Sequence, residues 1–481
     1  MAYYILNKGF GLRGWKGLPF ALRYPDPRFT NFYDKESYRV VYALDGRHDI
    51  DEADLTEKQK TVLEQLKKLN IALPSDGTER LEPYQEYHTY PGTYKKSVQW
   101  SITGRCNYHC RHCFMSAPDY KGKDLSLKDS LRILDQLAEN GVRLISITGG
   151  EPFVNPHFYD ILDGMVERNL ILETLYSNGK LVDEHLLEEL EKRGMHPSFH
   201  MSFDGLGWHD WLRGEDDAEE EVIRAFRLLK ERGYSTSSSM CLHKHNVHDI
   251  GKNISFLAEL GLQHLKMNVA SPAGRWKNET EHFITEDEAN QVIIDYLPEY
   301  VASGMPVSAQ FCSFLDFSKE TRTIRIPARK YSGQPGAENT FACGVVKQSM
   351  YISPAGKVLP CMTLGQTAID PQFDTSILEK DLGEILSGSH YLDMCNLKMG
   401  AVIEHNEKCH DCRYKLACGA GCRAAGCGET GTDYMAIDPN CCDFYLHGWY
   451  DKALELIETY KDSFPSSEGK NAEPVSETDL C

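Results

Sequence analysis

The stretch Cys106-Asn-Tyr-His-Cys110-Arg-His-Cys113 decides the interpretation of this chain, because it places three cysteines in a C-x3-C-x2-C loop. Three thiolates so close together can hold three irons of a four-iron cluster and leave the fourth iron free to bind another molecule. The ferredoxin run C-x2-C-x2-C-x3-C has a different spacing. A partial zinc site is the alternative. His112, inside the loop, is predicted to pack or hydrogen-bond beside the cluster rather than to bind it.

The cysteine loop directly follows the first of six predicted strands, which alternate with amphipathic helical stretches such as residues 125–139 and 219–232. The predicted strands are residues 98–103, 142–148, 171–176, 198–203, 235–242 and 264–269. Ser126 is predicted to cap the first helix. Successive strand–helix units imply a parallel sheet, so the predicted fold is α/β, either an open sheet or a partial (β/α)6 TIM-like barrel. In such folds the chemistry gathers at the C-terminal ends of the strands.

Three further polar or glycine-rich segments stand where predicted strands end. They are Thr148-Gly-Gly-Glu-Pro152, Tyr176-Ser-Asn-Gly179 and Ser202-Phe-Asp-Gly205. Together with the cysteine loop, their order and their places after strands resemble the radical S-adenosylmethionine (SAM) superfamily. His209-Asp-Trp-Leu-Arg-Gly214 and residues 272–275 also resemble segments that recur in one subgroup.

The resemblance implies that Cys106, Cys110 and Cys113 hold a four-iron cluster whose free iron chelates SAM. An electron from the cluster then splits the sulfonium bond, and the 5′-deoxyadenosyl radical abstracts a hydrogen from the substrate. The implied SAM-contacting residues are Thr148, Gly149, Gly150, Glu151, Ser177, Asn178, Ser202 and Asp204. The glycine pair would let the backbone approach the methionyl end, and Glu151 would accept from its ammonium group. The alternative roles are turn stabilisation for Ser177, Asn178 and Asp204, and an ion pair with an acidic neighbour for Arg213.

A second set of cysteines fills the C-terminal part of the chain. Cys343 is followed by Gly356 and Cys361 in a G-x4-C step. Farther on, the block from Cys409 to Cys422 has the spacing C-x2-C-x5-C-x3-C, and a Cys-Cys pair comes after it. This pattern resembles the SPASM domain, which houses two auxiliary four-iron clusters. Two structural zinc sites are the alternative, because C-x2-C pairs suit zinc equally well.

By this resemblance each auxiliary cluster has its own cysteines. The distal cluster would use Cys409, Cys412, Cys418 and one of Cys441 and Cys442, of which Cys442 is preferred because Cys442-Asp-Phe-Tyr resembles the usual ending. The nearer cluster would use Cys343, Cys361 and Cys422. Its fourth ligand is Cys312, Cys395, Cys427 or Cys441, or the iron is left open to a substrate thiolate. Cys241, inside a predicted strand, is expected to be a buried apolar residue.

The N-terminal residues 1–95 are predicted to be a small separate module. Short aromatic or β-branched runs separated by Gly and Pro predict strands, and residues 55–69 have helical spacing, so the module resembles a winged helix. Residues 1–47 carry a local charge of +4, which is either an ordinary solvated face or a docking surface for an acidic or extended peptide. The predicted division is completed by a SAM domain over 96–310, a cluster domain over 311–450, and a helix end with a disordered tail over 451–481.

The composition excludes several classes of protein. With 52 Lys+Arg against 71 Asp+Glu among 481 residues, the net charge of −19 is far from that of a nucleic-acid binder. No apolar run reaches the roughly 20 residues of a membrane helix, and the first residues do not resemble a signal peptide, so we predict a cytoplasmic protein. In a reducing compartment, 16 cysteines favour metal or redox chemistry over disulfides.

Radical SAM proteins with a SPASM domain and a winged-helix module are typically peptide maturases. We therefore predict oxidative formation of a thioether or carbon–carbon crosslink in a ribosomally made precursor peptide, with three four-iron clusters and an external flavodoxin- or ferredoxin-type electron donor. The alternatives are a peptide epimerase, an anaerobic sulfatase maturase, and a zinc or electron-transfer protein without turnover. Met362 disfavours the sulfatase maturase, which usually has an aspartate there. No catalytic side chain is singled out, and the peptide, the residue attacked and the oligomeric state are left open.

Overall fold

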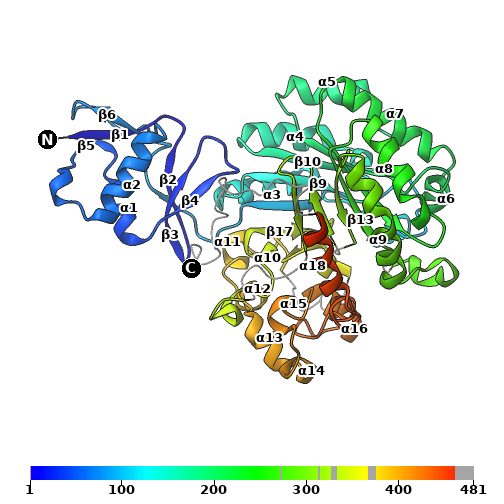
Figure 1. Cartoon of the computed structure of the whole chain (residues 1–481). Coiled ribbons are helices and arrows are strands. Elements are labelled where there is room, and N and C mark those ends of the chain that lie inside the picture. The colour runs from blue at the N-terminus through cyan, green and yellow to red at the C-terminus, as the bar shows by residue number, and fades with distance from the viewer. Residues whose placement is uncertain (1, 271–273, 313–314, 327–332, 367–374, 461–481) are drawn as a thin grey trace.

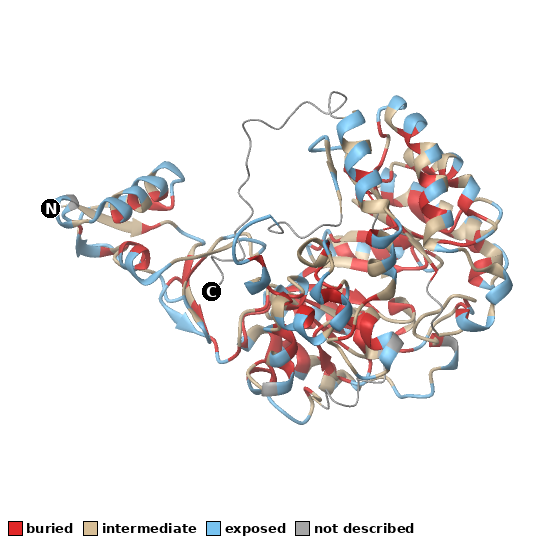
Figure 2. Cartoon of the chain, turned by 60° about the horizontal axis from the view of Figure 1, so that its bottom comes forward, coloured by how far each residue is buried: buried red, intermediate tan, exposed pale blue. Residues whose placement is uncertain are grey.

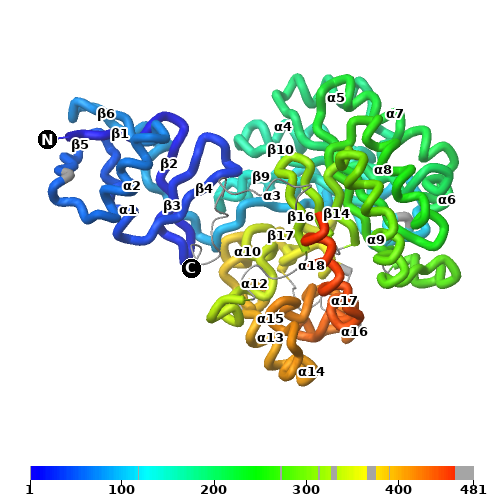
Figure 3. The backbone as a smooth tube through the Cα atoms, viewed as in Figure 1, coloured from blue at the N-terminus to red at the C-terminus, as the bar shows by residue number. Residues whose placement is uncertain are grey.

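The computed structural model describes residues 2–270, 274–312, 315–326, 333–366 and 375–460. Three sheets organise these residues, with three, four and eleven strands. Figure 1 shows the two small sheets on the N-terminal side, the large sheet with its helices beside them, and the cysteine-rich C-terminal segment below. The smooth backbone trace in Figure 3 shows the same three-part arrangement.

The two small sheets and two helices form the N-terminal module. The strands are β1 (Tyr3–Leu6), β2 (Gly11–Trp15), β3 (Leu18–Arg23), β4 (Thr30–Phe32), β5 (Asp45–Asp49), β6 (Ala72–Ser75) and β7 (His88–Thr89). The strand orders are β5-β1-β6 and β4-β3-β2-β7. Helices α1 (Lys35–Tyr42) and α2 (Glu57–Lys68) pack on each other. Helix α2 confirms the predicted helix, and its capping box joins Thr56 and Gln59. The winged-helix resemblance stays a prediction.

A row of seven parallel strands forms the centre of the large sheet. The strands are β8 (Ser97–Ser101), β9 (Leu144–Thr148), β10 (Ile171–Ser177), β11 (Ser198–Ser202), β12 (Thr236–Leu242), β13 (His264–Val269) and β14 (Ser308–Phe311). The first six confirm the predicted strands and the α/β class. The seventh strand, β14, was not predicted, because Ser-Ala-Gln-Phe is too short and too polar to show a strand pattern.

Helices connect these strands and cover the sheet. They are α3 (Leu127–Glu139), α4 (Phe158–Glu167), α5 (Glu184–Lys192), α6 (His209–Arg213), α7 (Ala218–Glu231), α8 (Ile250–Glu259) and α9 (Glu286–Ala302). Helix α3 begins as predicted, since the Ser126 side chain accepts a hydrogen bond from the Asp129 amide. Its buried residues Ile133, Leu134 and Leu137 recur at helical spacing and face the core.

The cysteine-rich segment joins the edge of the same sheet. Strand β17 (Ser349–Ile352) pairs parallel to β8, and β18 (Val358–Leu359) pairs antiparallel to β17. At the other edge, β15 (Leu315–Ser318) and β16 (Thr323–Arg325) add two antiparallel strands. The remaining elements are the short helices α10 (Val345–Gln348), α11 (Leu382–Ile385), α12 (Ser389–Cys395), α13 (Met399–His405), α14 (Glu407–His410), α15 (Lys415–Cys418), α16 (Arg423–Thr430) and α17 (Pro439–Leu446), and the longer α18 (Trp449–Tyr460). The predicted disordered tail lies largely outside the described residues.

One large hydrophobic core lies between the sheet and its helices. Figure 2 shows the buried residues concentrated along the strands and on the inward faces of the helices. Trp100 on β8 and Trp276 are among the largest side chains that are fully buried. Among the helices of the described residues, none combines the length and the apolar character that a membrane span requires.

Candidate active site

The three cysteines of the C-x3-C-x2-C loop lie together just beyond the C-terminal end of β8. All three are free thiols that pack in one small cluster with Tyr108. The Tyr108 amide lies 3.5 Å from the Cys106 sulfur, and the Ala117 amide lies 3.3 Å from the Cys113 sulfur. Burial raises the pKa of Cys106 to about 12, and the nearby charges of Cys110 and Cys113 contribute to the shift. A metal is the partner that would hold such thiols in their ionised form, so the loop fits an iron–sulfur cluster.

Glu151 lies close by in a fully enclosed position with neutral hydrogen-bond donors. Its carboxylate accepts from the Ser177 hydroxyl at 3.1 Å and from the Asn178 amide at 2.8 Å. Burial raises the pKa of Glu151 to about 7, against the lowering effect of these hydrogen bonds. The other described residue that donates to it is Phe153, through its backbone amide at 3.4 Å. A buried carboxylate that meets only neutral donors is suited to accept an ammonium group from a bound molecule.

The structure therefore brings Glu151, Ser177 and Asn178 into one place, at the ends of β9 and β10. The Asn178 side chain also donates to the Asn107 side chain at 2.8 Å, which connects this group to the cysteine loop. These residues fit the amino-acid end of SAM in the way that the sequence predicts. Their contact with SAM stays a prediction.

Gly149 and Gly150 have a structural role that the sequence did not suggest. A Cβ atom on Gly150 would lie 2.2 Å from the Arg105 carbonyl oxygen, and one on Gly149 would lie 2.6 Å from the Thr103 carbonyl oxygen. The Gly150 amide donates to the Thr103 carbonyl at 3.0 Å. Both glycines are thus needed because the end of β9 crosses the start of the cysteine loop at close range. Thr148 and Ser202 lie at the last positions of β9 and β11.

Asp204 lies beneath the cysteine loop and is occupied by the protein itself. One carboxylate oxygen accepts from two nitrogens of Arg213, both at 2.7 Å, and the other accepts from the Cys241 amide at 3.0 Å. Burial alone would raise the pKa of Asp204, but the Arg213 guanidinium holds it well below its usual range. The predicted acidic partner of Arg213 is thus Asp204, and we interpret Asp204 as a positioning residue, while its contact with SAM stays a prediction.

Arg213 also reaches the cysteine loop. A guanidinium nitrogen lies 3.9 Å from the Cys110 sulfur. His112 is enclosed in the same region. One of its ring nitrogens lies within 4.8 Å of the Asp204 carboxylate and of the Cys241 sulfur, which are equally close to each other. Sequence reasoning missed this grouping, because the three residues come from a loop and from the ends of two separate strands. Burial lowers the pKa of His112 to about 3, which fits a neutral packing group.

The C-terminal cysteines form two groups in the structure. Burial raises the pKa of Cys361 to about 12, and the charges of Cys422 and Cys343 add to the effect, so both of those thiols lie near Cys361. Burial raises the pKa of Cys409 to about 11, and the charges of Cys418, Cys412 and Cys442 add to it. These cysteines belong to the two predicted ligand sets, and their binding of two clusters stays a prediction.

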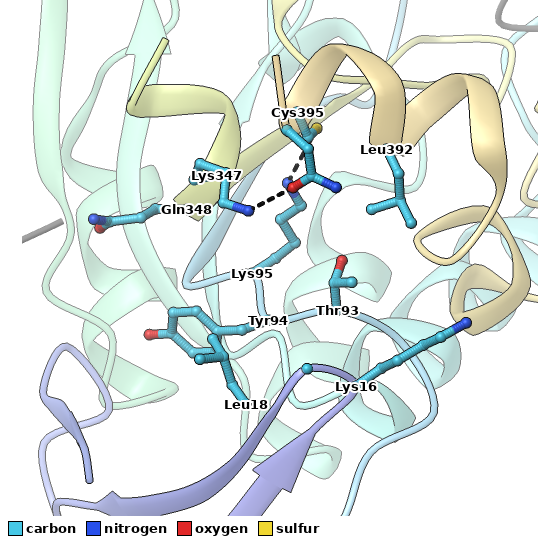
Figure 4. A pocket seen from close by; sticks show the side chains of 11 residues that line it. Lys16, Leu18, Thr93, Tyr94, Lys95, Lys347, Gln348, Leu392 and Cys395 are labelled. Atoms are coloured by element: carbon cyan, nitrogen blue, oxygen red, sulfur yellow. Dashed lines mark hydrogen bonds between the residues drawn. The ribbon is translucent and has the colours of Figure 1, made fainter. Parts of the chain in front are cut away.

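The four candidates for the remaining ligand lie in different places. A Cβ atom on Gly421 would lie 2.6 Å from the Cys441 Cβ, so Cys441 borders the segment that carries Cys422. The Cys427 thiol is near Cys422, whose charge contributes to its raised pKa after burial and Asp433. The Cys395 sulfur lies beside the ammonium group of Lys95 (Figure 4).

Cys312 lies apart from the other three candidates. It directly follows β14, and its raised pKa is caused by burial and by the charges of Glu286 and Cys241. Both neighbours belong to the strand–helix core, so the position of Cys312 favours the other three cysteines as ligands of the nearer cluster.

Comparison with known proteins identifies two regions of the chain. Residues 100–257 match the family described as the radical SAM superfamily, and residues 343–413 match SPASM, an iron–sulfur cluster-binding domain. An AdoMet-dependent heme synthase from Methanosarcina barkeri is 25% identical over 72% of this chain and 95% of its own length. The subtilosin biosynthesis protein AlbA of Bacillus subtilis is 26% identical over 54% of each chain.

Among solved structures, Streptococcus suis SuiB bound to S-adenosylmethionine has a TM-score of 0.60 at 16% identity and covers 91% of this chain and 99% of its own. The structure of SuiB bound to its precursor peptide SuiA gives a TM-score of 0.57 at 16% identity and covers 92% of this chain and 100% of its own. These matches show that the fold is shared over most of the molecule.

Proposed function

We propose that this chain, which belongs to the radical SAM superfamily and carries a SPASM domain, modifies a ribosomally made precursor peptide by forming a thioether or carbon–carbon crosslink. As a member of that superfamily it is an enzyme, so the zinc-scaffold and electron-carrier interpretations are set aside. In the proposed division, residues 1–95 would recognise the peptide, residues 96–310 would bind SAM, and residues 311–450 would hold the auxiliary clusters. Residues 451–481 are the helix end and the tail.

The extent of the structural match carries the proposal. The match to SuiB leaves uncovered about 9% of this chain, roughly 43 residues, fewer than the N-terminal module contains. The shared fold therefore extends into that module, and SuiB has been solved with a precursor peptide. AlbA, a biosynthesis protein for the bacteriocin subtilosin, supports the same class of substrate.

The residues of the site divide the work of binding. When bound, the cluster and SAM supply a 5′-deoxyadenosyl radical that abstracts a hydrogen atom from the substrate. Cys106, Cys110 and Cys113 would hold the cluster, and Glu151 would accept from the SAM ammonium. Asn178 would keep that carboxylate in register with the cysteine loop through its bond to Asn107.

The auxiliary cysteines would hold two further four-iron clusters. Crosslinking removes two hydrogens from the peptide, so an acceptor is needed for the second electron after the radical takes the first hydrogen atom. The Cys361 and Cys409 groups would hold clusters that could supply the acceptor for that electron, with the second hydrogen leaving as a proton. The flavodoxin- or ferredoxin-type partner would be the external electron donor for SAM cleavage.

Haem chemistry is the second candidate, because the heme synthase match covers 95% of that relative. It leaves more than a quarter of this chain unmatched, however, whereas the peptide-binding SuiB fold covers most of it. Sulfatase maturation is disfavoured by Met362, and epimerisation would leave the peptide mass unchanged.

The test is anaerobic incubation of the reconstituted enzyme with SAM, a reductant and a candidate precursor peptide encoded near the gene. We expect 5′-deoxyadenosine together with a peptide lighter by two hydrogens. Turnover of a porphyrin but not of the peptide would favour haem chemistry instead, and 5′-deoxyadenosine with an unchanged peptide mass would favour epimerisation.

The Cys106→Ala variant tests the assignment of the SAM cluster. We expect it to abolish SAM cleavage and to lower the iron content from roughly twelve to roughly eight per chain, because the auxiliary clusters remain. Cys481→Ala removes a thiol with no proposed ligand role and should change neither quantity. SAM cleavage by the Cys106 variant would contradict the assignment.

A further inference from the structure

The end of helix α6 lies against the cysteine loop, and this contact fixes the position of Arg213, the last residue of the helix. Gly214 follows in the left-handed conformation with a φ of 65°, and a Cβ atom on it would lie 2.6 Å from the His109 carbonyl oxygen. A ring nitrogen of His109 lies 2.8 Å from the Glu215 carboxylate. The backbone directly after Arg213 is therefore in close contact with the loop.

The two sides of the Arg213 guanidinium face different groups. Its Nε and one Nη each lie 2.7 Å from the same oxygen of the Asp204 carboxylate. The other Nη lies 3.9 Å from the Cys110 sulfur. Asp204 is fully buried and Arg213 is 8% exposed, so solvent and salt screen these charges little. The positive end of a buried ion pair thus points at one sulfur of the cysteine loop.

A cation in this position favours negative charge on the Cys110 sulfur and on a cluster bound to it. The potential of an iron–sulfur cluster depends on its net charge, on hydrogen bonds to its sulfurs and on its exposure to solvent. Reduction adds one electron, and an enclosed cation beside a ligand sulfur stabilises that added charge. Backbone amides approach the Cys106 and Cys113 sulfurs, whereas the Cys110 sulfur meets a full positive charge.

We propose that Arg213 raises the reduction potential of the SAM cluster through the Cys110 sulfur, and that Asp204 moderates this effect by partly cancelling the charge. The inference rests on the proposed assignment of that cluster to Cys106, Cys110 and Cys113, and it is independent of the substrate. A donor of the flavodoxin or ferredoxin type, itself oxidised by one electron, would then pass its electron to the cluster more readily. Arg213 and Asp204 are positioning residues in this role, because they act through Cys110.

The test is a redox titration of the full, anaerobically reconstituted chain with dithionite, followed by electron paramagnetic resonance. The titration is carried out without SAM, so contacts with SAM do not affect the potential. The signal of the SAM cluster is identified in separate samples as the one that changes when SAM is added and that Cys106→Ala removes. A signal that still responds to SAM in the Cys106 variant would overturn the assignment and the inference with it.

Removal of the two charges should shift the potential in opposite directions. Arg213→Gln/Asp204→Asn removes the nearer cation together with its counter-charge, so we expect a fall of at least about tenfold in the reduction equilibrium, or about 59 mV for one electron. Asp204→Asn alone leaves the cation uncompensated, so we expect a rise of at least about threefold, or about 28 mV. A loss of packing alone would shift both variants the same way, and that result would overturn the inference.

The matched control is Arg105→Gln. Arg105 directly precedes the first cysteine of the loop, pairs with Asp124 and has a side chain that is 53% exposed. Solvent screens such a charge, so we expect a change of less than about twofold, or about 18 mV. The auxiliary clusters are a second control, and their signals should stay within the same limit in every variant.

An unchanged potential in the double variant would contradict the role of Arg213. Arg213→Lys keeps the test decisive if the double variant does not assemble the SAM cluster. An ammonium group lacks the planar fork that serves two partners from two sides, so we expect a fall of at least about threefold, or about 28 mV, in this variant. No shift in the lysine variant would equally contradict the inference.

These potentials are measured without a peptide, so they are separate from turnover. If the potentials shift as expected but no peptide is modified, the proposed function fails and the role of Arg213 stands. If a crosslink forms but the potentials do not shift, the role of Arg213 fails and the proposed function stands.

Discussion

At the scale of single residues, the buried pair of Asp204 and Arg213 supports the cysteine loop. The Arg213 side chain contacts both the Asp204 carboxylate and the Cys110 sulfur, while the Arg111 amide donates to the neighbouring Leu212 carbonyl at 2.9 Å. Helix α6 is thereby joined to the loop through one charge pair and one backbone hydrogen bond. Because the pair is enclosed, each charge depends on the other for its stability.

Asp204→Asn should therefore destabilise the protein strongly. The substitution leaves the Arg213 guanidinium buried without its counter-charge, so we expect a loss of about 3–5 kcal/mol in the free energy of unfolding. Asp135→Asn is the control, because it breaks an ion pair with Arg168 in which the Asp135 side chain is 51% exposed, and such pairs contribute about 0–1 kcal/mol. Urea denaturation of both variants measures the difference, and equal losses would contradict the positioning role of Asp204.

Among single residues, the roles of the cysteines were predictable from the sequence and the contacts of Asp204 were not. Cysteine spacing predicts the ligand sets, because ligand spacing along a loop is a local property, and the binding of clusters by these thiols stays a prediction. The role of Asp204 was missed, because its partner Arg213 and its neighbour Cys241 come from different elements. Whether a carboxylate is open to a ligand or enclosed by the protein depends on those elements together.

At the scale of elements, the contact between α9 and α17 joins the strand–helix core to the cysteine-rich segment. Asp287 on α9 lies 2.8 Å from a ring nitrogen of His447, just beyond α17, and accepts from the Trp449 ring at 2.5 Å. Glu286, at the first position of α9, is repelled by the negative charge of Asp438, which caps α17. Two carboxylates thus face each other across this joint.

The joint should make stability depend on pH. Burial raises the pKa of Glu286 to about 7, and the charges of Asp438 and Asp287 add to the shift. The folded state therefore holds a proton that the unfolded state releases near pH 4.5, so Glu286 lowers stability as pH rises from about 4.5 to 7. Glu286→Gln should be neutral near pH 4.5 and stabilising by on the order of 1–3 kcal/mol at pH 8.

Thermal unfolding at the two pH values measures this difference. The control is Glu299→Gln, an exposed position on the same helix, where we expect a change within about 0.5 kcal/mol at either pH. A gain for the Glu286 variant that is the same at both pH values would show that titration is not its cause.

At the scale of the whole molecule, the cysteine-rich segment is tied to the core through the sheet and through helix α3. Strand β17 extends the core sheet at β8, with Met350 opposite Val98. The Gln136 side chain donates to the Ile377 carbonyl at 2.8 Å and accepts from the Leu382 amide at 2.6 Å. Beyond these contacts, the segment consists mainly of short helices and loops, which cannot be stable alone.

Loss of the clusters should consequently unfold part of the molecule rather than all of it. Metal binding contributes directly to the folding free energy of ligand-rich, loop-rich segments. We expect trypsin to cleave the iron-free protein within residues 398–446 at least about tenfold faster than the reconstituted protein, because more of the cleavable open form is populated. The rate of cleavage in the core, monitored by mass spectrometry, is the internal control and should change much less. Identical digestion with and without iron would contradict a structural role for the clusters.

The sequence by itself determined the α/β class, the six predicted strands and the cap at Ser126, and its cysteine spacing carries the proposed ligand sets. These features depend on hydrophobic period, capping residues and ligand spacing. Each of these signals comes from residues that are close together in the sequence, within a few helical turns or a single strand. Tertiary structure alone decided that β14 and β17 join the sheet and that Asp204 is enclosed by Arg213. Burial and charge balance belong to groups distant in sequence, so only the folded arrangement brings their energies together.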